Sequence, residues 1–192
     1  MDFRQQLRNQ LRQSRRALTV SDQQQASVGI AALLNQHLGD SPIKGYVGLY
    51  LANDGEPNLR SWAHWLWQQQ IPTALPVMHP FSRNHMLFQH FDQRTELSHN
   101  RFKIQEPCLN KCAMVLPSQL ELILTPLVGF DGKGNRLGMG GGFYDRYLAH
   151  CPQAIKIGVA HDCQQVDAIP VEPWDIGLNY IVTPTQWLEI VA

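Results

Sequence analysis

Four glycines fall within five positions of this chain, and that cluster limits what the segment around it can become. They are Gly138, Gly140, Gly141 and Gly142, in the stretch N-R-L-G-M-G-G-G-F-Y-D at 135–145. Residues without a Cβ atom reach left-handed backbone conformations, so successive N–H groups can point into one concavity and hold phosphate oxygens. The cluster therefore predicts a phosphate-binding loop.

The segments beside the glycine cluster fit the same interpretation. Residues 122–128 read L-I-L-T-P-L-V, which predicts a buried strand, and Y-D-R-Y-L from Tyr144 predicts a helix start. A strand, a glycine loop and a helix N-terminus are a common phosphate-site layout. The loop lacks G-x-x-x-x-G-K-[ST] spacing, and Phe143 stands where the dinucleotide fingerprint needs its third glycine. A flexible linker is the alternative that composition alone allows.

Size and charge restrict the class of protein. A chain of 192 residues that is 44% hydrophobic predicts one domain, 1–192. Lys+Arg and Asp+Glu both number 16, so we expect neither a nucleic-acid partner nor membrane association. The four cysteines form no C-x-x-C pair, and we expect a cytoplasmic monomer with reduced thiols. Cys108 and Cys112 with a histidine are a weak candidate zinc set, because a second ligand pair is missing.

Hydrophobic periodicity predicts helices alternating with strands. The expected helices are 3–18, one that starts with a cap at 21–24, and 59–70; the expected strands are 46–51, 73–78, 86–91, 122–128, 154–160 and 180–182. This alternation predicts an α/β fold with a mostly parallel sheet and helices on both faces. Ligands of such folds bind at the carboxyl ends of the strands.

Five arginines and no acidic residue lie on the expected helix 3–18, and Asp2 comes just before it. A solvated helix face is the ordinary interpretation of such a charge run. A nucleoside triphosphate, however, needs guanidinium groups beside the glycine loop. Arg4 and Arg8 are one helical turn apart and are the candidates, with Arg136 joining from the strand side.

Three carboxylates are candidates for other roles. Asp145 follows the glycine run and could hold Mg²⁺ beside phosphate or merely cap a helix, and Asp175 is a weaker second oxygen ligand. Glu56 lies in the loop after a strand, where a solvated turn residue is the alternative. A flat apolar slot could be lined by Phe81, Met86, Phe102 and Tyr144, although such residues are more often core.

Residues 122–148, which read L-I-L-T-P-L-V-G-F-D-G-K-G-N-R-L-G-M-G-G-G-F-Y-D-R-Y-L, resemble the signature of the 5-formyltetrahydrofolate cyclo-ligases, also called methenyltetrahydrofolate synthetases. The resemblance extends over nearly the whole chain, through R-Q-Q-L-R at 4–8, Y-L-A-N-D-G-E at 50–56, F-K-I-Q-E-P at 102–107 and W-D-I-G-L-N at 174–179.

The resemblance implies a three-layer fold like that of sugar-phosphate isomerases and CoA transferases. It implies closure of 5-formyltetrahydrofolate to 5,10-methenyltetrahydrofolate with ATP and Mg²⁺, releasing ADP and phosphate. The implied ATP-binding residues are Arg4, Arg8, Arg136, Leu137, Gly138, Met139, Gly140, Gly141, Gly142, Phe143 and Tyr144. The implied folate-binding residues are Leu51, Glu56, Met86 and Phe102; the magnesium ligands are Asp145 and Asp175; and the catalytic residues are Arg136, Tyr144 and Asp145.

Some positions depart from the family pattern. Arg4 stands where relatives usually have lysine and keeps the charge, whereas Phe143 replaces a frequent tyrosine and lacks its hydroxyl. Met139 and Gly141 replace cationic residues of some members, which leaves Arg136 with more of the loop's positive charge.

Two other functions stay open at this point. A sugar-phosphate or CoA-handling enzyme on the same fold suits the glycine loop but leaves Arg4 and Arg8 unexplained. A non-catalytic nucleotide or folate sensor would bind ligand yet release no ADP.

Overall fold

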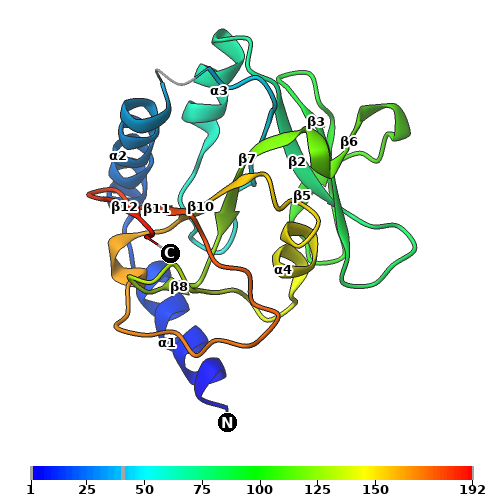
Figure 1. Ribbon diagram of the computed structural model, residues 1–192. Coiled ribbons are helices and arrows are strands. Elements are labelled where there is room, and N and C mark those ends of the chain that lie inside the picture. Colours follow the sequence, from blue (N-terminus) through cyan, green and yellow to red (C-terminus); the bar gives the residue numbers. More distant parts are fainter. Residues whose placement is uncertain (1, 40–41, 192) are drawn as a thin grey trace.

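The computed structural model describes residues 2–39 and 42–191 (Figure 1). The α-helices of this part are α1 (Phe3–Arg16), α2 (Val20–Leu38), α3 (Arg60–Gln68) and α4 (Phe143–Leu148). The strands are β1 (Tyr46–Gly48), β2 (Thr73–Met78), β3 (Met86–Phe91), β4 (Leu97–His99), β5 (Gln105–Pro107), β6 (Met114–Val115), β7 (Leu120–Pro126), β8 (Gly129–Phe130), β9 (Arg136–Leu137), β10 (Ile155–Val159), β11 (Tyr180–Val182) and β12 (Trp187–Glu189).

A sheet of eight strands, in the order β12-β11-β10-β7-β1-β2-β3-β6, organises the chain. Its central strands, from β11 to β2, are parallel to one another. Antiparallel strands complete both edges, β12 beside β11 on one side and β3 with β6 on the other. The predicted α/β fold with a mostly parallel sheet is therefore confirmed.

The two faces of the sheet pack against different helices. Leu34 of α2 and Trp62 of α3 share a core with Leu122 of β7, whereas the next residue, Ile123, packs with Leu148 of α4. Successive side chains of a strand point to opposite faces, so β7 is buried on both, as its nearly continuous apolar sequence requires. Helices cover both faces, as predicted.

Helix α1 lies at one end of the sheet, at the bottom of the view in Figure 1. Its Leu11 is buried and approaches β8 so closely that a Cβ on Gly129 would lie 2.4 Å from Leu11 Cδ1. A side chain at Gly129 would push the helix away. This contact brings the arginines of α1 to the loops that follow the parallel strands.

Several boundaries differ from the sequence prediction. Helix α1 ends at Arg16 rather than at residue 18, because Thr19 already caps α2 in a reciprocal pair with Asp22. The predicted strand 46–51 is regular only to Gly48, and the predicted helix 59–70 spans Arg60–Gln68. The short hairpin of β8 and β9 stands between β7 and the glycine loop, so that loop follows a hairpin rather than the buried strand.

Within the described ranges, no helix combines the length and the apolar character that crossing a membrane requires.

Candidate active site

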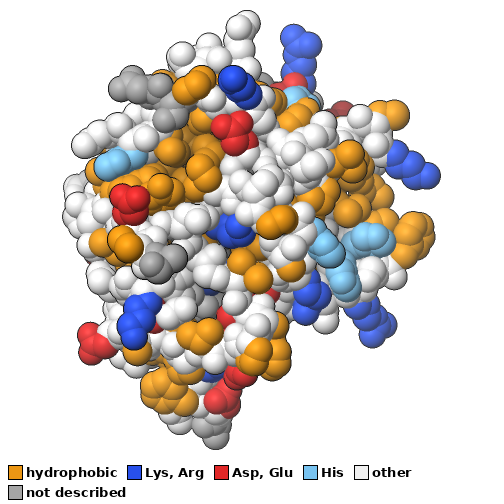
Figure 2. Space-filling model, viewed as in Figure 1, with side chains coloured by type: hydrophobic (Ala, Val, Ile, Leu, Met, Phe, Trp, Pro, Cys, Tyr) orange, Lys and Arg blue, Asp and Glu red, His pale blue; other side chains and the backbone are white. Residues whose placement is uncertain are grey.

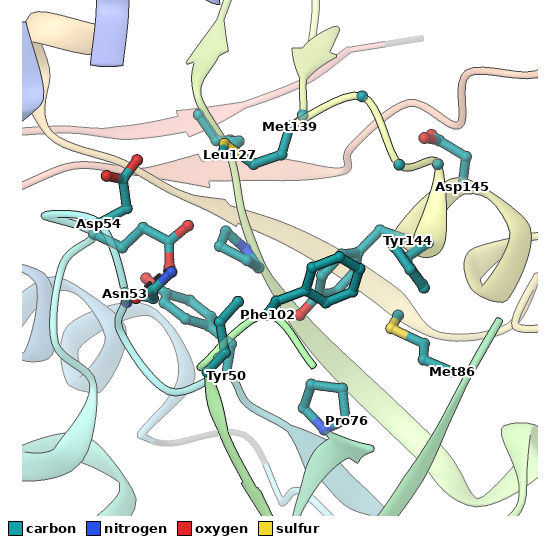
Figure 3. Close-up of a pocket in the computed structure, with 18 of the residues that line it drawn as sticks. Tyr50, Asn53, Asp54, Pro76, Met86, Phe102, Leu127, Met139, Tyr144 and Asp145 are labelled. Carbon is teal, nitrogen blue, oxygen red and sulfur yellow. Dashed lines mark hydrogen bonds between the residues drawn. The ribbon is translucent and has the colours of Figure 1, made fainter. Parts of the chain in front are cut away.

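A cavity of about 980 Å³ opens where the parallel strands end. It is lined by α1, the loop after β1, parts of β2 and β3, the hairpin of β4 and β5, and the glycine loop. Figure 3 shows Tyr50, Met86, Phe102 and Tyr144 around this cavity. The carboxyl edge of a parallel sheet is where α/β proteins bind ligands. Segments far apart in the sequence therefore meet at the expected place.

Figure 2 shows lysine and arginine side chains spread over the visible face of the molecule rather than gathered in one field. The charges that matter for a polyanion must therefore be found locally, beside the cavity.

The glycine loop, residues 138–142, is anchored from two sides. The carbonyl of Gly138 accepts a hydrogen bond from Arg8 Nε at 2.8 Å, and the carbonyl of Gly141 accepts one from Arg146. Gly140 and Gly142 have φ angles of 92° and 63°, the left-handed conformations that glycine permits. A loop held in this way is not a flexible linker, so that alternative is wrong.

The amide groups of the same loop have no internal partners. In the part of the chain that the structure describes, no hydrogen bond is donated by the backbone N–H of Met139, Gly140, Gly141 or Gly142. Leu137, by contrast, has its side chain buried in β9 and away from the cavity, and its carbonyl accepts from the N–H of Val128. Unpaired N–H groups that line a cavity are donors suited to phosphate oxygens.

Arg4 and Arg8 both reach the cavity from α1. A Cβ on Gly140 would lie 3.6 Å from Arg8 Cζ, so the guanidinium of Arg8 lies directly against the loop. Partial burial, and next to it the charge of Arg4, lower the pKa of Arg8. Arg4 NH1 and NH2 each donate to Asp175 Oδ2 at 3.0 Å. The solvated-face alternative is therefore wrong for these two arginines.

Arg136 is buried beside the loop rather than free in the cavity. Its NH2 donates to Asp145 Oδ1 at 2.5 Å and its NH1 to the carbonyl of Ile176, whose N–H donates to the same carboxylate oxygen at 3.2 Å. Asp145 does not cap helix α4, because the N-cap is Gly142 and no side chain bonds there. The capping alternative is wrong, and Asp145 instead ties Arg136 to the loop before β11.

Asp145 and Asp175 line the same cavity, and each is bonded to an arginine. Among residues 2–39 and 42–191, no three or more His, Cys, Asp or Glu side chains gather closely enough to hold a metal ion, and Cys108 and Cys112 are exposed. Mg²⁺ commonly takes one or two protein carboxylates and fills its shell with phosphate oxygens and water. Asp145 and Asp175 beside the glycine loop are consistent with this coordination, and the magnesium assignment stays a prediction.

The other end of α1 holds the loop after β1 through one carboxylate. Asp54 accepts from Arg12 Nε at 2.9 Å, Arg15 NH2 at 2.8 Å and Arg16 Nε at 2.5 Å. Burial alone would raise the pKa of Asp54, but its bonds to Arg12 and Arg16 and the charges of Arg12 and Arg15 hold it below its ordinary value. No sequence pattern assigned Asp54 a role, because only the tertiary structure pairs it with the arginines.

Glu56 follows on the same loop and faces the cavity. Its Oε2 accepts from the N–H of Asn53 at 3.1 Å, and its Oε1 lies 3.8 Å from Arg15 NH1. Burial raises the pKa of Glu56 from its ordinary 4.5 to about 7, although Arg15 and the Asn53 bond oppose the shift. The side chain is only 12% exposed, so the solvated-turn alternative is wrong.

The predicted apolar slot exists, with one exception. Leu51, Met86 and Phe102 line the cavity, and the ring of Phe102 packs edge-on against Phe143 with centroids 6.1 Å apart. Phe81 is 95% exposed in the turn between β2 and β3 and lies outside the cavity lining, so its assignment to the slot is wrong.

Tyr144 contributes a hydroxyl with no partner. Its oxygen is buried and unbonded within the described residues. Burial, with a further contribution from Glu56, raises the pKa of this phenol, so it stays protonated and able to donate. A buried polar group without a protein partner is rare, and Tyr144 also lines the cavity, so its hydroxyl is a candidate donor to a bound ligand.

The hairpin of β4 and β5 adds residues that sequence reasoning missed. Glu106 and Asn100 line the cavity, and the carboxylate accepts from the N–H of Met78 and from Asn100 Nδ2, both at 3.0 Å. Residues 92–118 show no clear periodicity, so the only available signal was the F-K-I-Q-E-P motif at 102–107.

One cavity thus joins a cationic, amide-lined end to a slot with apolar and carboxylate walls. This combination is suited to an α/β enzyme that binds a polyanion beside a flat ligand. A model described as the 5-formyltetrahydrofolate cyclo-ligase family matches residues 1–184. The chain belongs to the 5-formyltetrahydrofolate cyclo-ligase family, and it is an enzyme of that type.

Named relatives and solved structures agree. The 5-formyltetrahydrofolate cyclo-ligase of Escherichia coli (strain K12) is 41% identical over 182 residues, covering 93% of this chain and 99% of the relative. That of Haemophilus influenzae is 40% identical, covering 91% and 94%. The fold is similar to the 5,10-methenyltetrahydrofolate synthetase of Aquifex aeolicus, with a TM-score of 0.83, 25% identity and coverage of 98% and 93%. The fold is also similar to the 5,10-methenyltetrahydrofolate synthetase of Mycoplasma pneumoniae. The TM-score is 0.77 and the identity 29%, and the match covers 95% of this chain and 99% of that chain.

Proposed function

We propose that this enzyme uses ATP and Mg²⁺ to convert 5-formyltetrahydrofolate into 5,10-methenyltetrahydrofolate, with release of ADP and phosphate. The observation that carries the proposal is the single cavity that places unpaired loop amides and two arginines near an apolar slot. A formamide oxygen is a very poor leaving group, so the reaction needs a step that turns it into phosphate.

In this proposal the glycine loop and α1 bind the triphosphate. Backbone N–H groups of residues 139–142 bind phosphate oxygens, and Arg8 and Arg4 add charge-assisted bonds. Arg4 exchanges Asp175 for phosphate when the nucleotide arrives, which frees that carboxylate. Asp145 and Asp175 then hold the magnesium ion, which neutralises charge on the transferred phosphoryl group.

The apolar slot holds the folate with its formyl oxygen toward the γ-phosphate. Transfer of the γ-phosphoryl group to that oxygen gives an iminium phosphate; N10 attacks the same carbon, loses its proton, and phosphate departs. The unpaired hydroxyl of Tyr144 donates a hydrogen bond to the formyl and phosphoryl oxygens that react. Arg136 keeps the carboxylate of Asp145 oriented. Catalysis rests on positioning and on stabilising phosphoryl charge, so no protein nucleophile is required.

The direct test is an assay with 5-formyltetrahydrofolate, ATP and Mg²⁺. We expect the near-ultraviolet absorbance of the methenyl product to rise, with one ADP formed per product. Omission of ATP should abolish the signal. Turnover without ATP would instead favour a sugar-phosphate or CoA-handling enzyme, and ligand binding without ADP release would favour a sensor.

The metal assignment has its own test. Asp145→Asn should raise the Mg²⁺ concentration needed for half-maximal turnover by about tenfold or more, because one charged contact is typically worth about 1.5–3 kcal/mol. Folate affinity, measured by calorimetry, should stay within twofold. Asp167→Asn, at an exposed position outside the cavity lining, is the control. Equal losses of Mg²⁺ and folate affinity in Asp145→Asn would contradict the assignment.

A further inference from the structure

The cavity is lined by several carboxylates, and one of them differs from the rest. The acids that line it are Asp54, Glu56, Glu106, Asp145, Glu172 and Asp175. Each of the others lies within 4 Å of an arginine nitrogen, at distances up to 3.8 Å. Glu106 has no such partner in the described ranges. The carboxylate of Glu106 is therefore available to bind donor groups of a ligand.

Only one oxygen of Glu106 is used by the protein. Oε2 accepts from the N–H of Met78 and from Asn100 Nδ2, both at 3.0 Å, whereas Oε1 has no bond within the described residues. Asn100 is itself fixed, because its Oδ1 accepts from the N–H groups of Phe102 and Ile104 at 2.9 and 3.1 Å. The amide nitrogen must then face Glu106. The carboxylate is held rigidly, with one oxygen free.

Apolar residues of the cavity wall lie beside this carboxylate. Met78, whose N–H bonds Glu106, lines the cavity together with Phe102 and Ile104, whose N–H groups bond Asn100. A carboxylate oxygen in such a wall gains most from N–H donors, because few water molecules compete once a flat ligand covers it. The site therefore calls for a planar ring whose edge carries adjacent N–H groups.

We propose that Glu106 determines specificity for the pteridine, its Oε1 accepting hydrogen bonds from the 2-amino group and the neighbouring N3–H of the pyrimidinone edge. The inference rests on the proposed function, since it takes 5-formyltetrahydrofolate as the ligand. Phe102 and Met86, which line the same cavity, supply the apolar contact for the ring. Among the arginine-paired acids, Asp145, Glu172 and Asp175 lie at the proposed phosphate end, and Asp54 and Glu56 lie on the loop after β1, where Glu56 faces the cavity.

The informative variant is Glu106→Gln. The amide oxygen of the substituted side chain would keep both anchoring bonds, which turns its NH₂ group toward the pteridine donors and removes the acceptor. Binding is measured by calorimetry, with a non-hydrolysable ATP analogue and Mg²⁺ present, for 5-formyltetrahydrofolate and for its 2-desamino analogue. Thermal unfolding checks the fold, and Glu189→Gln, an exposed position on β12, is the control.

We expect the wild type and the control to bind 5-formyltetrahydrofolate at least tenfold more tightly than the desamino analogue. Glu106→Gln should lose about tenfold or more in affinity for the natural ligand and bind both ligands within threefold of each other, with ATP affinity unchanged. Unchanged folate affinity, or an equal loss for both ligands, would overturn the inference. A selective loss of ATP affinity would overturn it in favour of a contact to adenine.

These outcomes separate the inference from the proposed function. Because the readout is binding, loss of discrimination in Glu106→Gln would support the pteridine contact even if the wild type formed no methenyl product. Conversely, normal turnover with an insensitive Glu106→Gln would leave the function standing and remove the contact. A wild type that binds no folate would overturn both.

Discussion

Helix α1 presents arginines to two different surroundings. Near its N-terminus, Arg8 lies against the glycine loop and uses Nε for one carbonyl and NH1 for a long 3.4 Å bond to Gln5. Near its C-terminus, Arg15 is fully buried and bonds the Asp54 carboxylate, the Asp54 carbonyl and the Leu127 carbonyl. The first end keeps donors for a ligand, whereas at the second end each nitrogen of the guanidinium is engaged by the protein.

The difference teaches how one helix serves both stability and binding. A guanidinium with open donors beside unpaired amides can exchange partners when a polyanion arrives. A guanidinium buried among fixed acceptors cannot, because removing any partner leaves an uncompensated group. We therefore expect substitutions at the two ends to affect different measurements.

The largest effect is expected at the buried end. Arg15→Ala should lower the free energy of unfolding by about 3–5 kcal/mol, because it leaves a cavity and unpaired carbonyls beside Asp54. Urea unfolding followed by circular dichroism measures this change. A loss of unfolding free energy below about 1 kcal/mol would show that the buried end of α1 tolerates substitution as well as the end beside the glycine loop does.

The second prediction concerns the loop that Arg15 supports. Folding raises the pKa of Glu56 from 4.5 to about 7, so the folded state binds more protons than the unfolded state in this range and stability falls as pH rises. Relative to Glu56→Gln, the wild type should lose on the order of 2–3 kcal/mol of unfolding free energy between pH 4.5 and pH 7. Parallel curves for the two proteins would refute the shifted pKa.

At the open end the expected effect is on binding. Arg8→Ala should raise the KM for ATP about 10- to 100-fold, since a charged hydrogen bond is typically worth about 1.5–3 kcal/mol. The free energy of unfolding should change by less than about 1 kcal/mol, because the side chain is only partly buried. Steady-state kinetics and urea unfolding together test this division. An unchanged KM would show that Arg8 only packs against the loop.

The smallest effect sharpens the contrast within the buried end. Arg16 bonds the same carboxylate as Arg15, but its side chain is 55% exposed. Arg16→Ala should cost no more than about 0.5–1 kcal/mol, because exposed ion pairs contribute little. The same urea titration measures it. A loss as large as that of Arg15→Ala would mean that the charge of Asp54, rather than the burial of each arginine, determines how much the ion pairs contribute to the free energy of unfolding.

Much of this site could be predicted from local sequence. The glycine loop, the parallel strands and the cationic α1 each carry a pattern within a few residues, and the structure brings Arg4, Arg8, Glu56 and Asp145 to one cavity. The assignment of Phe81 to the slot was wrong, because the sequence around an aromatic residue does not distinguish a core, a slot and an exposed turn. Glu106 was missed because residues around it have no periodicity that fixes a strand.

The sequence by itself determined the alternation of strands and helices, because hydrophobic period and glycine backbone freedom are local properties of the chain. It also determined the glycine loop and, through the motif, the family. Only the tertiary structure decided which charge meets which. In the folded protein Arg15 pairs with Asp54 and Arg136 pairs with Asp145. Glu106 has no cationic partner among the described residues. Such pairings depend on distances between segments remote in sequence, and burial then sets the strength of each one.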